Sequence, residues 1–295
     1  MLKRIFFILV TVWGSQLSAG DSKFRVYELF LNLPIYEDYK RSLAGKDIAD
    51  IDIADLPKIA RTRHIAEILI HQIAPVLGGC NCRIMYSPYA SDTSHARSLE
   101  QIRLSQQVSH GVASFLTDSR ANADGILLSE PILAADEFFV GLYTHEARSD
   151  ILELDDPDEL KQLRFGVSRN WEIDRKVLAD RNLIEVTADG WNNLMVMVAN
   201  KRADVIMQPF TAEEDFSFTD SGQGLKLLPI PNYKMLFGDG RSYTISSTHP
   251  NGEEFLTALN KGIRLLRENG TIHEFMVNSG VINERVEDFV ELKFD

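Results

Sequence analysis

Segments typical of β-strands alternate with segments typical of amphipathic helices along most of this 295-residue chain, and the connections between them are short. This alternation indicates α/β units built on a mainly parallel sheet. It begins again at residue 138, so the sequence predicts two α/β lobes. The expected strands are 23–33, 83–87, 112–116, 138–143, 164–168, 183–186, 204–207 and 243–246, and the expected helices are 61–77, 97–107, 155–160, 174–179, 190–200, 252–268 and 271–279.

The first twenty residues have the order of a secretory signal peptide. Lys3 and Arg4 precede an apolar run at 5–13, and small or polar residues follow at 14–20. The run is well short of the roughly 20 apolar residues that a membrane-spanning helix needs. We therefore expect cleavage near residue 20 and a mature protein in the periplasm, with an uncleaved anchor as the alternative.

The charge balance limits the classes of partner. Asp and Glu total 43 against 31 Lys and Arg, which gives a formal net charge of −12. Nucleic acids and anionic membranes both require a basic surface, so neither is an expected partner. The sequence carries no P-loop, Gly-x-Ser-x-Gly or His-Glu-x-x-His signature. We therefore expect no catalytic residues, no cofactor and no metal.

The only cysteines, Cys80 and Cys82, are separated by a single residue. In an exported protein such a pair favours a disulfide. A redox pair or half of a metal site are the alternatives, but no second cysteine pair completes a zinc site. We interpret the pair as a local staple at a turn from helix to strand.

Two other polar groups raise the question of a metal. Residues 40–58 hold four aspartates without the glycine and terminal glutamate of a calcium loop, so an acidic, solvated surface insertion is expected. In the helix expected at 61–77, His64, Glu67 and His71 share the arc opposite the apolar residues. This spacing suits a metal, but the amphipathic pattern predicts that these side chains face water.

Several short motifs follow one another between residues 112 and 281. They are T-D-S-R at 117–120, L-S-E-P at 128–131, L-K-Q-L-R-F-G-V at 160–167, N-K-R-A-D-V-I at 200–206, Y-T-I at 243–245 and L-L-R-E-N-G-T at 265–271. Their order and spacing resemble those of type II extracytoplasmic solute-binding proteins, of the kind that serve polar amino-acid ABC transporters. The first hundred residues lack the G-F-x-x-D element of that family.

The resemblance implies a two-lobed, type II periplasmic-binding-protein fold in which each lobe is a mainly parallel sheet flanked by helices. Two hinge segments, near 133–141 and 237–243, would join the lobes. Gly238 and Gly240 suit the second segment, since glycine accepts backbone angles that other residues avoid. The implied division is residues 1–20 as signal peptide, 21–138 and 242–295 as lobe 1, and 139–241 as lobe 2.

Arg120 is the residue that the resemblance links most directly to a ligand. In the family this arginine grips a ligand carboxylate, which its planar guanidinium matches with two parallel hydrogen bonds. Thr117 would cap the preceding turn and leave backbone N–H groups free for an anion. The alternative for Arg120 is a surface salt bridge. Its distance of nine residues from Ser129 is two longer than is usual in the family.

In lobe 2 the resemblance points to the turn at 168–171, where Asn170 and Trp171 replace the usual Gly and Ser or Thr. Trp171 would line the ligand or pack within the lobe. Pro209 stands where the family has an acid for an ammonium group, so the expected ligand widens to a small polar or carboxylate-bearing molecule. The candidate ligand-binding residues are Arg120, Thr117, Phe115, Asn170, Trp171, Ser168, Gln208 and Tyr89, with packing as the alternative for Tyr89.

The expected function is capture of a small, amino-acid-like solute by a monomer whose lobes close around it. The solute would then pass to an ABC permease, or its presence would be reported to a membrane sensor. Fold alone leaves two alternatives open, because one fold hosts many functions. They are an interaction or sensory protein with a decayed cleft, and an exported, dehydratase-like enzyme.

Overall fold

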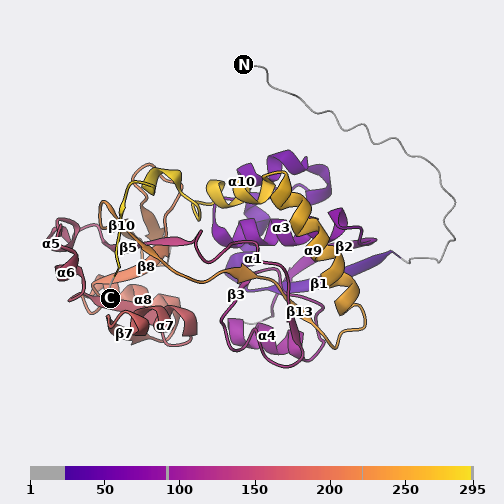
Figure 1. Ribbon diagram of the computed structural model, residues 1–295, viewed down its shortest axis with the longest axis horizontal. Helices are drawn as coiled ribbons and strands as arrows, with labels where there is room; N and C mark the ends of the chain where they lie inside the picture. Colours follow the sequence, from indigo (N-terminus) through magenta and orange to yellow (C-terminus); the bar gives the residue numbers. More distant parts are fainter. Residues whose placement is uncertain (1–23, 91–92, 221, 294–295) are drawn as a thin grey trace, which may run out of the picture.

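The computed structural model describes residues 24–90, 93–220 and 222–293, and the expected signal peptide lies outside these ranges. Figure 1 shows two groups of helices and strands side by side, joined by extended segments. We call them lobe 1, which holds β1 to β4 and the long helices, and lobe 2, which holds the large sheet. Within the described ranges, no helix combines the length and hydropathy needed to span a membrane.

Lobe 1 is built on two parallel strands, β1 (Arg25–Leu31) and β2 (Cys82–Pro88). Alternate side chains of β1 point to one face and are buried there, as expected for a strand with one covered face. Helices α3 (Arg63–Leu77) and α9 (Gly252–Glu268) pack against each other in the same lobe. A Cβ atom on Gly262 would lie 1.8 Å from the Ala74 carbonyl oxygen, so this close packing requires glycine.

The other elements of lobe 1 are short. The insertion expected at 40–58 is largely exposed, and Asp47 and Asp52 each cap a single 3-10 turn through the backbone N–H two residues on. The remaining elements are α1 (Leu33–Ser42), α2 (Leu56–Ile59), α4 (His95–Arg103) and α10 (Thr271–Asn278), with β3 (Ser114–Phe115) antiparallel to β12 (Arg241–Ser242) and β4 (Ile126–Leu128) antiparallel to β13 (Thr244–Ser246).

Lobe 2 is an eight-stranded mixed sheet in the order β14-β11-β5-β8-β6-β7, with β10 paired to β5 and β9 to β10. Its parallel parts are β7-β6-β8 and the edge pair β11-β14, whereas β5 is antiparallel to β8, β10 and β11. The strands are β5 (Phe139–His145), β6 (Arg164–Ser168), β7 (Ile184–Ala188), β8 (Val205–Pro209), β9 (Phe218–Asp220), β10 (Leu225–Pro229), β11 (Tyr233–Leu236) and β14 (Val290–Glu291), and the helices are α5 (Ser149–Leu152), α6 (Pro157–Leu160), α7 (Glu172–Asp180) and α8 (Gly190–Ala199).

The sheets therefore have parallel cores with antiparallel additions, where mainly parallel sheets were expected. The reason lies in the route of the chain. It enters lobe 2 along β5 and leaves along β11, and adjacent strands that run toward and away from the same hinge are necessarily antiparallel. The same return produces the antiparallel pair of β3 and β12 in lobe 1.

The chain crosses between the lobes three times, not twice. The first crossing leads from β4 to β5, and the second leads from β11 through 237–240 to β12. The third follows α10, because Val290 of β14 pairs in register with Tyr233 of β11. The division that kept 242–295 wholly in lobe 1 is therefore wrong for the last residues. Two residue pairs, Tyr233 with Val290 and Lys234 with Glu291, join this segment to the edge of the lobe 2 sheet.

The polar side chains of α3 that were expected to face water, among them Glu67 and His71, are buried. Glu67 and His71 have no exposed surface. His71 lies 2.7 Å from the Tyr86 hydroxyl through Nδ1 and 2.9 Å from Ser109 Oγ through Nε2. Burial lowers the pKa of His71 to about 3, so the ring is neutral. The amphipathic interpretation failed because the polar side chains of this helix are paired inside the lobe.

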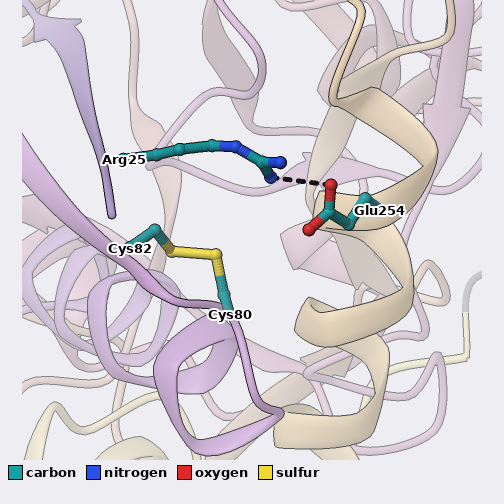
Figure 2. The surroundings of a disulfide bond; sticks show 4 residues. All are labelled: Arg25, Cys80, Cys82 and Glu254. Atoms are coloured by element: carbon teal, nitrogen blue, oxygen red, sulfur yellow. Dashed lines mark hydrogen bonds and ion pairs between the residues drawn. A yellow bond between two sulfur atoms is a disulfide. The ribbon is translucent and has the colours of Figure 1, made fainter. Parts of the chain in front are cut away.

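Cys80 and Cys82 form a disulfide between the end of α3 and the start of β2 (Figure 2). In the same view, Arg25 at the start of β1 reaches Glu254 of α9 with an N–O distance of 2.6 Å. Among the described residues, no group of three or more His, Cys, Asp or Glu side chains is arranged to hold a metal ion. The disulfide between Cys80 and Cys82 thus connects the end of α3 to the start of β2.

Candidate functional site

The residues after β3 in lobe 1 lie against the first turn of α7 in lobe 2. Ser119 Oγ donates to the two carboxylate oxygens of Glu172, at 2.9 and 3.1 Å. Arg120 Nη1 lies 3.5 Å from the Asn170 carbonyl oxygen, and Arg120 Nε lies 3.7 Å from the Glu172 carboxylate. The sequence-predicted residues Arg120 and Asn170 thus meet across the junction between the lobes, through polar contacts.

The guanidinium of Arg120 already has a carboxylate partner. Its Nε donates to Asp118 Oδ1 at 3.0 Å, and its Nη2 donates to Asp118 Oδ2 at 3.2 Å. Asp118 is buried, and it also accepts the backbone N–H of Arg120. The two-pronged geometry expected for a ligand carboxylate is therefore made within the segment itself.

Thr117 and Phe115 are engaged at the hinge. The backbone N–H and the hydroxyl of Thr117 both donate to Asp239 Oδ2 in the second crossing, at 3.2 and 2.6 Å. The ring of Phe115 stacks on Phe237, with centroids 4.8 Å apart, and Phe138 of the first crossing packs beside them. The cap expected at Thr117 is replaced by this bond, because Asp239 approaches from the other segment.

The turn after β6 carries the lobe 2 candidates. Ser168 is buried at the end of β6, and its carbonyl accepts the N–H of Trp171 at 2.9 Å. The Trp171 ring lies 6.2 Å from the ring of Trp191 in α8, which agrees with the packing alternative. Asn170 is exposed beside it. This turn therefore faces lobe 1 mainly through backbone and polar groups.

Two candidates are not brought to this junction by any contact among the described residues. The Tyr89 hydroxyl donates to Gln101 Oε1 at 2.7 Å, and its ring stacks on Phe30 within lobe 1. Gln208 lies in β8 opposite Gly141 of β5. Both belong to the local structure of one lobe.

A buried ion pair in lobe 1 was missed by the sequence reasoning. Glu67 of α3 accepts from Arg241 of β12 at Nε, 2.6 Å, and at Nη2, 3.3 Å, and it also accepts the Ala113 N–H at 3.1 Å. Glu67 is fully buried and Arg241 is 3% exposed. The only sign of this pair in the sequence was the presence of a glutamate in a helix made mostly of apolar residues.

Arg63, at the start of α3, lies next to this pair. Its Nε is buried without a hydrogen-bond partner, and it lies 3.7 Å from Glu67 Oε1. Burial, together with the charge of Arg241, lowers the pKa of Arg63 to about 10. His64 beside it is held neutral, because burial lowers its pKa to about 4. Arg63 is thus a guanidinium with unused hydrogen-bonding capacity.

Lobe 2 presents Asp174 of α7 toward these arginines. Desolvation raises the pKa of Asp174 to about 6, and the charges of Arg63 and Arg241 oppose this rise. Asp174 is half-buried, and its carboxylate accepts a hydrogen bond from its own backbone N–H. No direct ion pair joins Arg63 and Asp174. The charges of the two arginines in lobe 1 thus act on a carboxyl group of lobe 2.

A cavity of about 450 Å³ lies beside the hinge. Its walls come from α7, from the second crossing and from the third crossing, and one wall is Thr117 of lobe 1. This volume falls within the range of about 300–1,000 Å³ that is usual for small-molecule sites. The lining includes Ile173, Val177, Phe237, Asp239 and Leu292.

Comparison with known proteins gives similarity in structure only. No family model and no curated protein sequence matches the chain. Solved structures similar to it include the amino acid ABC transporter substrate-binding protein AbpA from Streptococcus pneumoniae bound to L-arginine, at 16% identity and a TM-score of 0.49, covering 74% of this chain and 85% of that chain. The periplasmic VFT2 domain of Bordetella pertussis BvgS has 18% identity and a TM-score of 0.48, covering 70% and 81%. An ancestral arginine-binding protein bound to arginine has 13% identity and a TM-score of 0.47, covering 72% and 85%.

Proposed function

We propose that this chain is an extracytoplasmic solute-binding protein that captures a small polar or carboxylate-bearing molecule between its two lobes. It acts in the periplasm as a monomer and delivers the solute to an ABC permease or reports it to a membrane sensor. It performs no catalysis. The order of motifs from Thr117 to Thr271 supports this assignment.

One observation carries the proposal: the segment after β3 meets the first turn of α7 through polar side chains, and Phe115, Phe138 and Phe237 pack together at the hinge. The contacts of Ser119 and Arg120 with Asn170 and Glu172 are hydrogen bonds and charge pairs. Such contacts exchange with water or solute at little cost, whereas an apolar core does not. These polar contacts can therefore open and close without exposing apolar side chains.

Closure then follows as a shift between two populations. A solute bound to one lobe in the open form gains additional contacts only when the other lobe reaches it. The aromatic group of Phe115, Phe138 and Phe237 at the hinge keeps the crossings packed while the lobes rotate. The difference in affinity between open and closed forms sets the extent of closure.

A second candidate function has its own observation in support. The fork of Arg120 is filled by Asp118, and Glu172 accepts from Ser119, so the chain's own side chains occupy the groups that were expected to bind a solute. This favours a sensory or interaction protein that closes on its own side chains. In such a protein the closed form is the resting state, and signalling depends on its opening.

Thermal unfolding in the presence of solutes separates the two candidates. A panel of L-amino acids, short peptides and organic acids is added to the mature protein, and the midpoint is measured against solute concentration. A binding protein gains stability with free ligand as mass action requires. If the midpoint stays constant with every solute of the panel, the solute-binding function is wrong and the second candidate stands.

A further inference from the structure

We propose that the cavity beside the hinge is a second binding site, and that its ligand is a small amine, in which a cationic nitrogen is attached to a short apolar body. The buried carboxylate of Asp239 binds the nitrogen, and the apolar side chains around it bind the body. The described residues of the lining do not include Arg120 or Glu172, which meet at the junction between the lobes. The site therefore goes beyond the proposed function and is tested independently of it.

Asp239 places a buried carboxylate in the wall of the cavity. The residue belongs to the second crossing and is 5% exposed. The backbone N–H and the hydroxyl of Thr117 both donate to its Oδ2, at 3.2 and 2.6 Å. Within the described part of the chain, no hydrogen bond or ion pair reaches Oδ1. A carboxylate can accept about four hydrogen bonds on its two oxygens, so Oδ1 is available to a donor inside the cavity.

The chain's own cations around the cavity do not neutralise this carboxylate. Lys176 pairs with Asp180. Arg181 donates through Nη2 to a backbone carbonyl oxygen of β11 at 2.9 Å, and Lys293 is exposed. Within the described ranges, none of these three cations lies at ion-pair distance from Asp239. A buried carboxylate is costly unless a cation lies close to it, so this wall favours a ligand that carries a cationic group.

Apolar side chains form much of the remaining lining. Ile173 and Val177 are buried residues of α7, and because they lie four positions apart they share one face of the helix. Phe237 and Leu292, which are also buried, come from the second and third crossings. Burial of hydrocarbon against such walls is favourable in proportion to the area removed from water. The cavity therefore suits an organic cation better than a bare metal ion.

Volume and charge together narrow the class of ligand. The cavity of about 450 Å³ lies in the lower part of the range of about 300–1,000 Å³ for small-molecule sites. An anionic molecule would bring a second negative charge to the buried carboxylate. An alcohol would donate one hydrogen bond but would leave the charge of the carboxylate unpaired. A protonated amine with a few carbon atoms supplies both a charge-assisted hydrogen bond and hydrocarbon for the apolar walls.

The first experiment uses the wild-type mature protein and three probes of similar length, n-butylamine, n-butanol and butyrate. Binding is measured from the backbone amide signals of Phe237, Gly238 and Asp239 in proton–nitrogen NMR spectra. We expect n-butylamine to shift these signals saturably, n-butanol to bind at least about tenfold more weakly, and butyrate not to bind. From ethylamine to n-butylamine, each added methylene group should raise the affinity about fourfold, because it is buried against the apolar walls.

The second experiment removes the charge of the carboxylate. D239N keeps a side-chain oxygen that can accept from Thr117 and hardly alters the volume of the cavity. We expect this variant to bind n-butylamine at least about tenfold more weakly than the wild type. The matched control is D189N, because Asp189 is 76% exposed and is not among the described residues of the lining, so its affinity for n-butylamine should equal that of the wild type. Far-ultraviolet circular dichroism checks the fold of both variants.

Four results would overturn the inference while leaving the proposed function intact. They are the absence of saturable amine binding, equal affinity for n-butylamine and butyrate, unchanged affinity in a folded D239N protein, and amide shifts confined to the junction at Ser119, Arg120 and Asn170. If D239N does not fold, the comparison of the three probes on the wild type still decides the question. If amines bind at the hinge but no solute of the thermal panel stabilises the protein, the proposed function fails and this site stands.

Discussion

Glu67 in α3 and Arg241 in β12, which are 174 residues apart in the chain, form a two-pronged ion pair that is buried in lobe 1. Arg241 also donates to the Ala113 carbonyl oxygen, and its guanidinium lies over the Phe115 ring at 4.5 Å. The pair thus ties α3 to the strand that leaves the hinge. Its removal affects both the lobe and the crossing.

We expect E67Q to destabilise the protein by about 3–5 kcal/mol, because Arg241 would remain buried without a counter-charge. The free energy of unfolding is measured by urea denaturation. The matched control is E254Q, because Glu254, drawn with its partner Arg25 in Figure 2, is 62% exposed, and no measurable change is expected there. Equal effects of the two substitutions would contradict the assigned role of the buried pair.

The pH dependence of Asp174 gives a second prediction. The pKa of Asp174 is raised from 3.8 to about 6, so the folded protein binds more protons than the unfolded chain between these values. Ionised Asp174 therefore opposes folding above about pH 6, and this cost disappears as the pH falls to about 4.

We accordingly expect D174N to be more stable than the wild type at pH 7, by about 1–2 kcal/mol, and equally stable near pH 4. Urea denaturation at the two pH values measures the difference. D180N, at the other end of α7, should show no such dependence. A D174N protein that is less stable than the wild type at pH 7 would refute the assigned burial of this carboxylate.

Arg120 provides a test of the site expected from the motifs. R120A should weaken binding of a carboxylate solute by at least about tenfold. It should also lower the unfolding midpoint of the free protein, because the buried Asp118 carboxylate loses its guanidinium partner. R169A, an exposed arginine of lobe 2 paired with Asp189, serves as control. Calorimetry that finds equal affinities for R120A and wild type would remove Arg120 from the site.

The disulfide closes a very short loop, so its stabilising effect should be small. Chain-entropy arguments give about 1–2 kcal/mol for a ring of this length. The C80S/C82S double variant should therefore fold, and its urea midpoint should match that of the reduced wild type. Failure of the variant to fold would show that the bond determines more than the turn between α3 and β2.

The sequence pattern located the parallel core of lobe 2 well. The strand expected at 164–168 coincides with β6, and α8 ends one residue before the helix expected at 190–200. These elements are short and bounded by turn residues, and each packs against its neighbours in the chain: β6 is buried from Phe165 to Ser168, and α8 buries Leu194, Met195 and Val198. Local pattern is sufficient where each element is buried by its nearest neighbours in the chain.

The pattern failed where distant segments meet. Glu67 looked like a solvent-facing residue because its partner, Arg241, belongs to a strand of only two residues. Likewise, Arg63 lies on α3 of lobe 1 and Asp174 lies on α7 of lobe 2, far apart in the chain. Such pairings depend on tertiary approach, and a single sequence has no periodic signal for them.

The third crossing limits how the two lobes can move. Arg285 donates to the carbonyl oxygens of Glu213 and Glu214, and the Lys234 ammonium holds the carbonyls of Val286 and Glu287. Two parallel connections permit both bending and twisting, but a third attachment away from them suppresses the twist. We therefore expect the halves of this protein to swing along one arc, which would keep the same two surfaces opposite each other throughout the motion.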